Sequence, residues 1–389
     1  MEKVIHICLC GPMTDGFSYQ ENLLSKYHKR LGYEVTLITS EWIWDNNGKL
    51  ARDGRNSYIN EHNIPVFRLP IRNNKNVENK FKRYEGLYQT IEKEKPDILF
   101  IHGCQFLDLW VIRKYLKKHP DVKAYVDNHA DFSNSGTNPV SKYVLHKGIW
   151  KIGTKAISSY IKKFYGVLPA RVDFLTDMYG VAKEQTELLV MGADDEQVEK
   201  TEKEKLGEKV REKYGILQDD FLIVTGGKID KAKAQTIYLM EAVKKLQNPK
   251  VKLLVFGSVE EELKEQVESL TDGERIINIG WINAEDSYAF FAAADVVCFP
   301  GRHSVFWEQV AGQGIPMIVK HWEGTEHVDV GGNVKFLYKD STEEIIEVLQ
   351  SITLDNKGMY SKMKEIAADK GKKVFSYLEI AKKALELVE

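Results

Sequence analysis

Two successive rounds of short β-rich runs alternating with longer helical runs constrain the fold of this 389-residue chain most strongly. In the first round, strands are predicted at 4–9, 34–39 and 98–102, with helices at 19–31 and 80–95. The second round begins with a strand at 221–225 and ends with one at 317–319. Strand–helix–strand alternation favours parallel sheets that helices cover on both faces. The sequence therefore predicts two α/β domains, each long enough to bury its own core.

A charged segment at 196–213 separates the two rounds. It holds six acidic and six basic residues, which is typical of a solvated helix with ion pairs between residues four apart. We place the first domain at 1–195, the second at 196–372, and a last segment at 373–389. The amphipathic pattern of 374–388 predicts that this last segment is a helix.

Composition argues against several classes of protein. Lys and Arg number 55 against 57 Asp and Glu, a balance that argues against a dedicated nucleic-acid binder. The four cysteines lie in apolar runs without a CxxC spacing, so we expect reduced core thiols in a cytoplasmic protein and no structural zinc. We find neither a leader-like N-terminus nor an apolar run of the roughly 18 residues that a membrane span needs.

In each of the two predicted domains, a glycine-containing loop follows the first strand. Gly11 and Gly16 flank a loop between the first strand and first helix, where backbone amides can approach an anion. Gly226-Gly227-Lys228 occupies the matching place in the second domain, and Lys233 follows before the helix. Cations beside exposed amides suit a diphosphate, although an ordinary βα turn and a lysine-rich surface turn remain alternatives. Neither loop has the dinucleotide or the Walker pattern.

The segment 299–316 is the richest in candidate ligands. It follows a predicted strand, and open α/β sheets bind ligands where strands end. His303, Ser304, Glu308 and Gln309 are polar residues among apolar neighbours. A carboxylate there can accept two hydrogen bonds from a ribose diol, and Ser304 can alternatively cap the following helix.

A strand of the first domain ends in a cluster of acidic residues around one histidine. His129 lies between Asp127 and Asp131, which is a candidate reactive group. His102 ends a neighbouring strand, and there we favour a structural role. We find no HExxH, GxSxG or DxD pattern, so hydrolase and metal-dependent transferase interpretations lack support.

The segment 132–172 contains no acidic residue. Lysines alternate there with aromatic residues such as Tyr143, Trp150 and Tyr160. This composition suits a membrane interface or an anionic substrate, and nucleic acid fits it too. An ordinary surface helix packed by its aromatic residues is the alternative.

Taken together, these segments resemble the retaining family-four (group one) glycosyltransferases of the GT-B fold over nearly the whole chain. Gly226–Lys233 is similar to that family's diphosphate motif, with Lys228 and Lys233 at its two cationic positions. Gly11–Gly16 is similar to its opening loop, and His129 to its strand-end histidine near the donor sugar. Glu308 matches the second glutamate of a pair, whereas Pro300 stands where the first would be, and His303 and Ser304 take its place. If the family's pattern is instead aligned by counting back from Pro316, Gln309 stands at the position of the second glutamate.

The resemblance implies two Rossmann-like doubly wound domains that face a cleft, with a C-terminal helix that crosses back to the first domain. It implies a hexosyltransferase that moves a sugar from a nucleoside-diphosphate sugar to a glycan or lipid-linked acceptor, with retention, in bacterial cell-surface polysaccharide assembly. Donor binding would fall to Gly11, Gly16, Gly227, Lys228, Lys233, His303, Ser304, Glu308 and Gln309, and catalysis to His129 and Asp131. We expect neither a metal nor a cofactor, because lysines and a helix dipole neutralise the diphosphate.

We also expect no nucleic-acid partner, and peripheral contact with the inner membrane face through 142–171. A nucleotide-sugar epimerase on the same fold and a catalytically inactive GT-B binding scaffold remain alternatives. The missing first glutamate favours the inactive scaffold, and the presence of Lys228, Lys233 and Glu308 argues against it.

Overall fold

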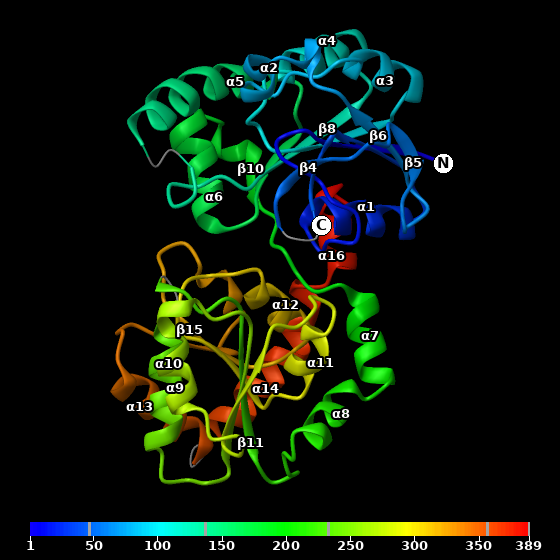
Figure 1. Cartoon of the computed structure of the whole chain (residues 1–389). Helices are drawn as coiled ribbons and strands as arrows, with labels where there is room; N and C mark the ends of the chain where they lie inside the picture. Colours follow the sequence, from blue (N-terminus) through cyan, green and yellow to red (C-terminus); the bar gives the residue numbers. More distant parts are fainter. Residues whose placement is uncertain (46–47, 136–137, 232–233, 355–357, 388–389) are drawn as a thin grey trace. The chain divides into compact units, whose positions relative to one another are not determined.

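The computed structural model describes residues 1–45, 48–135, 138–231, 234–354 and 358–387. The chain divides into two compact units, Met1–Val190 with Ile380–Glu389, and Met191–Glu379 (Figure 1). Within the described ranges, no helix is both long enough and apolar enough to cross a membrane.

The first unit is built on an eight-stranded sheet of order β10-β9-β8-β7-β1-β2-β6-β5 among the described residues. Its neighbouring strands run parallel except β5, which is antiparallel to β6. The strands are β1 (Lys3–Cys8), β2 (Glu34–Ser40), β5 (Ser57–Ile59), β6 (Pro65–Leu69), β7 (Ile98–His102), β8 (Lys123–Asn128), β9 (Lys163–Gly166) and β10 (Thr186–Leu188), and β3 (Trp42–Trp44) and β4 (Leu50–Arg52) form a separate hairpin.

Helices cover both faces of this sheet, and the two faces differ in polarity. The face under α3 (Leu87–Glu94), α4 (Leu109–Lys118) and α5 (Lys151–Ser158) is an apolar cluster that includes Ile5, Leu99 and Ile112. The opposite face lies under α1 (Gln20–Arg30) and α16 (Tyr377–Ala384) (Figure 1). Because strand side chains alternate between faces, it receives His6, His102 and Asp127. The remaining helices of the unit are η1 (Arg72–Asn74), α2 (Asn76–Lys80), the π-helices η2 (Val140–Trp150) and η3 (Leu175–Tyr179), α6 (Pro169–Phe174) and η4 (Lys183–Gln185).

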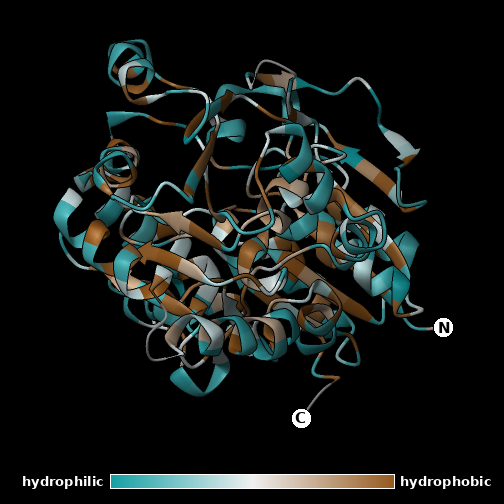
Figure 2. Cartoon of the chain, turned by 90° about the horizontal axis from the view of Figure 1, so that it is seen from below, coloured by the Kyte–Doolittle hydropathy of each residue, from teal (hydrophilic) through white to brown (hydrophobic). Residues whose placement is uncertain are grey.

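The second unit contains a parallel six-stranded sheet of order β13-β12-β11-β14-β15-β16 within the described part of the chain. Its strands are β11 (Phe221–Gly226), β12 (Val251–Phe256), β13 (Ile276–Gly280), β14 (Val296–Phe299), β15 (Met317–Lys320) and β16 (Val334–Leu337). Its helices within the described ranges are α7 (Asp195–Lys203), α8 (Leu206–Lys213), α9 (Gln235–Lys245), α10 (Glu261–Leu270), α11 (Ser287–Ala292), α12 (Phe306–Gly312), η6 (Glu326–Val328), α13 (Thr342–Thr353), α14 (Met359–Ile366), η7 (Ala367–Gly371) and α15 (Lys372–Val374). Hydrophobic residues concentrate on the central strands and hydrophilic ones on the outer helices (Figure 2).

Two predicted helices are interrupted. The helix expected at 80–95 begins only at Leu87, because Lys82 and Gly86 have positive φ values of 54° and 79°. The helix expected at 374–388 is split between α15 and α16. The chain between them pairs with Ala193, whose amide donates to the Phe375 carbonyl at 2.8 Å while its carbonyl accepts from the Tyr377 amide at 3.2 Å.

Candidate active site

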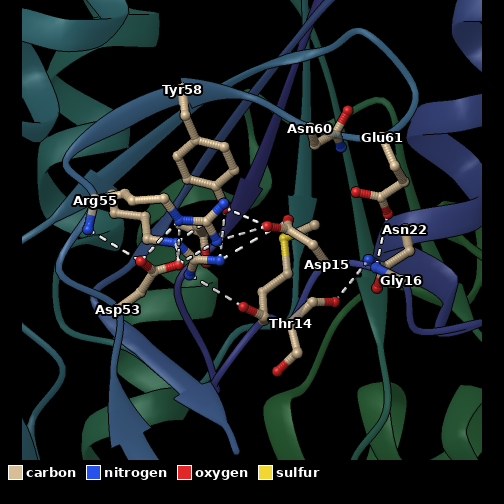
Figure 3. Close-up of polar contacts among 12 residues, drawn as sticks. Thr14, Asp15, Gly16, Asn22, Asp53, Arg55, Tyr58, Asn60 and Glu61 are labelled. Carbon is tan, nitrogen blue, oxygen red and sulfur yellow. Dashed lines mark hydrogen bonds and ion pairs between the residues drawn. The ribbon is translucent and has the colours of Figure 1, made fainter.

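The opening loop of the first unit is held by a polar network from the segment around β5 (Figure 3). The carboxylate of Asp15 accepts hydrogen bonds from Arg55 at 2.9 Å and from the Tyr58 hydroxyl at 2.8 Å. The buried Arg68 guanidinium donates to the Met13 carbonyl at 3.0 Å and forms an ion pair with Asp53. These contacts fix the backbone of the loop between Gly11 and Gly16.

The amide of Gly16 points to a carboxylate side chain of this network. It donates to the Glu61 carboxylate at 2.7 Å, and Gly16 has a φ of 75°, a conformation that favours glycine. Gly11 is exposed, and no atom lies within 4 Å of the position that a Cβ would take there. The Gly16 amide is therefore a backbone donor of the kind that binds phosphate, and in the structure a carboxylate occupies it.

His129 follows β8 and contacts the carboxylate of Asp127. Its Nε2 is buried 3.5 Å from Asp127 Oδ2, while the side chain as a whole is 37% exposed. Burial lowers the pKa of His129, but Asp127 outweighs this effect and raises it above the usual histidine value. Asp127 is itself fully buried and also contacts His102 Nδ1 at 2.7 Å. His129 is thus a partly exposed imidazole oriented by a buried carboxylate.

Asp131 is positioned differently. Its oxygens accept hydrogen bonds from the Ser133 and Asn134 amides at 2.8 and 3.1 Å, and from Arg171 Nε at 3.0 Å. Asp131 is 5% exposed. These contacts favour a role in shaping the loop after His129 over direct participation in a reaction.

In the second unit, the glycine loop after β11 lies against the loop after β12. A Cβ on Gly257 would stand 2.0 Å from the Gly227 carbonyl oxygen, so the two backbones touch. Lys228 follows directly, and its ammonium forms an ion pair with Glu260 at 2.7 Å. The predicted site residue Lys233 lies outside the described residues. Lys228 is a cation at the strand end, as predicted, with an acidic partner that the sequence pattern did not indicate.

Glu308, in the first turn of α12, is the buried centre of a triad with two partly buried histidines. One of its oxygens, Oε1, accepts from His303 Nε2 at 2.7 Å and from His327 Nε2 at 2.8 Å. Burial alone would raise the pKa of Glu308, but His303 and His327 hold it well below its usual value. Among the described residues, its other oxygen, Oε2, is buried without a hydrogen-bond partner. A buried carboxylate oxygen without a donor is costly, so Oε2 marks a position where a ligand hydroxyl fits.

Ser304 and Gln309 flank this triad. Helix α12 begins after Val305, and no side chain caps it, so the capping alternative for Ser304 is not realised. Gln309 directs its amide nitrogen to the Ser287 hydroxyl at 2.9 Å, which links α12 to α11. The contacts therefore favour Glu308 over Gln309 as a ribose ligand.

A cavity of about 220 Å³ lies at the ends of β12 and β13. Its lining includes Ser258, Asn278 and Gly280, together with Trp281, whose side chain is exposed. A planar aromatic surface beside backbone polar groups is suited to a nucleotide base.

Two clusters bring histidine and carboxylate atoms within 4.8 Å of one another, His102–Asp127–His129 and His303–Glu308–His327. Divalent transition metals prefer such atoms as ligands. In the first cluster, both ring nitrogens of His102 are already in hydrogen bonds, to Asp127 and His6, so this ring has none left for a metal. The second cluster keeps Glu308 Oε2 and His327 Nδ1 without hydrogen-bond partners among the described residues.

Sequence reasoning missed three histidines. His327 lies in η6, 19 positions after Glu308, and no motif connects the two. His6 and His28 look like ordinary residues of a strand and a helix. Their involvement depends on contacts between distant elements, which a sequence pattern does not reveal.

Two protein-family models match the chain. The model described as "Glycosyltransferase Family 4" matches residues 22–197, and the one described as "Glycosyl transferases group 1" matches residues 207–370. No curated protein matches the sequence.

Solved structures share the fold at low sequence identity. A glycosyltransferase from Rickettsia africae ESF-5 is 15% identical, with a TM-score of 0.70 over 99% of this chain and 97% of that one. Anabaena Alr3699/HepE in complex with UDP is 15% identical, with a TM-score of 0.69 over 100% and 99%. UDP-GlcNAc 2-epimerase from Neisseria meningitidis is 12% identical, with a TM-score of 0.64 over 100% of both chains.

The two matched segments lie one in each α/β unit, and the structural matches extend over essentially the full chain. The predicted α/β fold with two Rossmann-like domains is confirmed. The chain thus consists of a family 4 domain followed by a group 1 domain and belongs to the glycosyltransferases of the GT-B fold.

Proposed function

We propose that the protein transfers a hexose from a nucleoside-diphosphate sugar to a glycan or lipid-linked acceptor, with retention at the anomeric carbon. The proposed setting is bacterial cell-surface polysaccharide assembly at the inner membrane face. The observation that carries the proposal is Glu308 of α12, whose buried Oε2 has no hydrogen-bond donor in the part of the chain that the structure describes. A ribose diol supplies the two hydroxyl donors that such a carboxylate takes.

The diphosphate has its own ligands in this proposal. The side chains of Lys228 and Lys233 neutralise charge as the nucleoside diphosphate leaves. The Gly227 amide already donates to the Phe256 carbonyl at 3.0 Å, so Gly227 contributes a backbone that a diphosphate can approach closely because it has no side chain. Lys228 now contacts Glu260, so the incoming diphosphate would replace this carboxylate. The Gly16 amide, which now contacts Glu61, would undergo the same exchange. Lysines and amides then supply the positive charge that a metal supplies elsewhere.

His129 acts at the transferred sugar in this proposal. Its partly exposed ring is held by Asp127, which leaves Nδ1 to interact with a sugar hydroxyl. The base is assigned to the cavity beside Trp281. Because the Anabaena relative is described with UDP and with UDP-glucose, uridine is the first nucleotide to test.

The acceptor side of the proposal rests on the basic segment of the first unit. Val140, Tyr143, Val144 and Ile152 are each more than half exposed on η2 and α5. Lys142 and Lys147 lie 5.8 and 5.1 Å from the Tyr143 ring centre. Exposed apolar side chains framed by lysines suit an anionic membrane surface.

A thermal-shift series with UDP, GDP, ADP and TDP, each with and without EDTA, tests the donor site. A ligand at 100 times its dissociation constant stabilises the folded state by about 2.7 kcal/mol. We expect one nucleotide to raise the melting temperature equally in both conditions. An EDTA-sensitive shift would contradict metal independence, and no shift with any nucleotide would favour the inactive scaffold.

Turnover of the selected nucleotide sugar separates transfer from epimerisation. The fold similarity to a 2-epimerase makes this comparison necessary. We expect the sugar ring to remain unchanged without an acceptor, and an α-configured product from an α-configured donor when acceptor is present. Proton NMR of the sugar shows both results, and an epimerised sugar without acceptor would overturn the transferase assignment.

A further inference from the structure

Four hydrogen bonds connect Asp127 with three buried histidines and a backbone carbonyl. Asp127 Oδ2 contacts His102 Nδ1 at 2.7 Å, and His102 Nε2 contacts His6 Nδ1 at 3.0 Å. His6 Nε2 then contacts His28 Nδ1 at 2.9 Å, and His28 Nε2 contacts the Ala381 carbonyl at 3.0 Å. We call His28, His6 and His102 the histidine chain.

The fold explains why these residues meet. His102 and Asp127 are register partners on β7 and β8, and His6 lies on the next strand, β1. His28 lies on α1, which covers this face. Ala381 belongs to the last turn of α16, where carbonyls lack partners within the helix. His6, His28 and Asp127 are fully buried, and His102 is 5% exposed.

The carbonyl at one end fixes the direction of every hydrogen bond. A carbonyl only accepts, so His28 donates from Nε2, and in the neutral ring its Nδ1 accepts from His6 Nε2. By the same reasoning, His6 Nδ1 accepts a hydrogen bond from His102 Nε2. A neutral His102 then has no proton left for Asp127. The four hydrogen bonds need four protons, whereas three neutral imidazoles carry three.

The fourth proton therefore belongs to the hydrogen bond between His102 Nδ1 and Asp127 Oδ2. Burial lowers the pKa of His6 well below its usual value and that of His28 to about 3, so these two rings stay neutral. Burial also opposes ionisation of Asp127, but His102 and His129 outweigh it and lower the pKa of this carboxyl. A His102⁺–Asp127⁻ pair accounts for the fourth proton without adding net charge, and its 2.7 Å hydrogen bond offsets part of the cost of burying the two charges.

This pair lies directly behind His129. Asp127 Oδ2 contacts His102 on one side and faces His129 Nε2 at 3.5 Å on the other. The other charged groups that act on His129 are Glu21 of α1 and Arg171 of α6. A cation on His102 therefore compensates part of the negative charge that His129 experiences.

We propose that His102, His6 and His28 are positioning residues, which hold one proton against Asp127 and thereby fix the orientation and limit the proton affinity of His129. The catalytic part of this inference rests on the proposed function, because His129 is assigned there to the reacting sugar. The chain itself is a property of the folded first unit and can be tested without substrate.

Nitrogen-15 NMR of the full-length protein labelled at histidine tests the proton count. Between pH 6 and 8 we expect His6 and His28 to be neutral with the proton on Nε2, and His102 to be protonated on both nitrogens. Assignment uses the single substitutions described below. A neutral His102 in this range would overturn the proposal, even if no variant folds.

Two substitutions at one position form the matched pair. His6→Gln keeps one donor and one acceptor, whereas His6→Leu keeps neither, so the buried His102 N–H loses its acceptor and His102 loses its extra proton. The charge of Asp127 then acts on His129 without compensation. We expect the pKa of His129, titrated by NMR, to rise by about one unit or more in His6→Leu and to stay unchanged in His6→Gln.

His102→Gln gives the same expected rise if His6→Leu does not fold, and His119→Gln, on the surface of the first unit, is the control. An unchanged pKa of His129 in His6→Leu or His102→Gln would refute the histidine chain. The pH profile of kcat should shift upward with the NMR titration, with KM unaltered. An NMR shift without a change in the kcat profile would leave the chain intact and refute the role of His129 in transfer.

Discussion

At the scale of single residues, the two carboxylates with the clearest assignments, Asp127 and Glu308, are both buried between two imidazoles. Glu308 keeps one oxygen for a ligand, because both imidazoles contact the other oxygen. Asp127 uses one oxygen for both of its imidazoles as well. Asp127 Oδ1 is likewise buried without a hydrogen-bond partner among the described residues, and Asp127 is assigned the orienting role because its Oδ2 faces His129 Nε2 at 3.5 Å.

Replacing Glu308 by glutamine tests the binding role. The substitution removes a charged acceptor and places an amide beside two imidazole N–H groups. A hydrogen bond to a charged group contributes about 1.5–3 kcal/mol, so we expect nucleotide affinity to fall by roughly ten-fold to 150-fold. Calorimetric titration measures the loss. Glu343→Gln, on the exposed surface of α13, is the matched control, and equal affinity of both variants would contradict the ribose assignment.

The buried His28 predicts a pH dependence of stability. Its folded-state pKa of about 3 lies below its usual value of 6.5, so the unfolded chain binds a proton that the folded chain does not. The contribution of neutral His28 to the free energy of unfolding is complete above pH 6.5. It is lost as the pH falls toward 3, by at most about 1.4 kcal/mol per pH unit. Urea denaturation at pH 7, 6 and 5 should show it.

His28→Gln is the comparison for this slope. The variant should be less stable at pH 7 and should lose about 2 kcal/mol less than the parent chain between pH 6.5 and 5. Identical slopes for the parent and His28→Gln would show that His28 is protonated in the folded protein.

At the scale of elements, the loop after β11 is shaped by contact with the loop after β12. Gly257→Ala places a methyl group 2.0 Å from the Gly227 oxygen at a φ of 127°. We expect a destabilisation of at least about 2 kcal/mol by chemical denaturation, with weaker nucleotide binding. Gly273→Ala shares a positive φ but has no atom within 4 Å of the new methyl group, so it should cost less and leave binding unchanged.

The elements also show what the sequence could predict. The strand predicted at 4–9 corresponds to β1, and that at 221–225 to β11, because buried parallel strands are continuous apolar runs bounded by turns. The helices at 80–95 and 374–388 were wrong in their continuity, because tertiary contacts decide it. The Tyr84 amide bonds to the Asp108 carboxylate at 2.7 Å, and the chain near Phe375 pairs with Ala193. The hydrophobic periodicity of a local segment does not indicate such distant partners.

The candidate site shows the same difference between residues that a local sequence pattern indicates and residues that distant contacts bring in. Glu308, Lys228 and His129 were predicted because each lies in a segment that follows a predicted strand, and parallel strands bring their carboxyl ends to one edge of a sheet. His327 and His28 could not be predicted, since their partners lie 19 and 353 positions away. Motif spacing finds residues placed by one element, whereas long-range packing places the others.

At the scale of the whole molecule, each unit supplies one part of the proposed reaction. The second unit holds Lys228, Glu308 and the cavity beside Trp281, and the first unit holds Gly16, His129 and the exposed basic segment. This assignment makes membrane association a property of the first unit alone. A variant of η2 should therefore change vesicle binding without changing nucleotide affinity.

The double substitution Lys142→Gln/Lys147→Gln tests this separation. Each lysine near an anionic surface contributes about five-fold in affinity, so we expect vesicle binding to weaken by about 25-fold. Sedimentation with vesicles containing anionic lipid measures it, and UDP affinity should stay constant. Lys209→Gln/Lys213→Gln on α8 removes the same charge from the second unit and should bind vesicles normally. Equal loss in both variants would show that net charge alone attracts the protein. Binding to purely zwitterionic vesicles that persists in 0.5 M salt would assign the contact to the apolar side chains around Tyr143 instead.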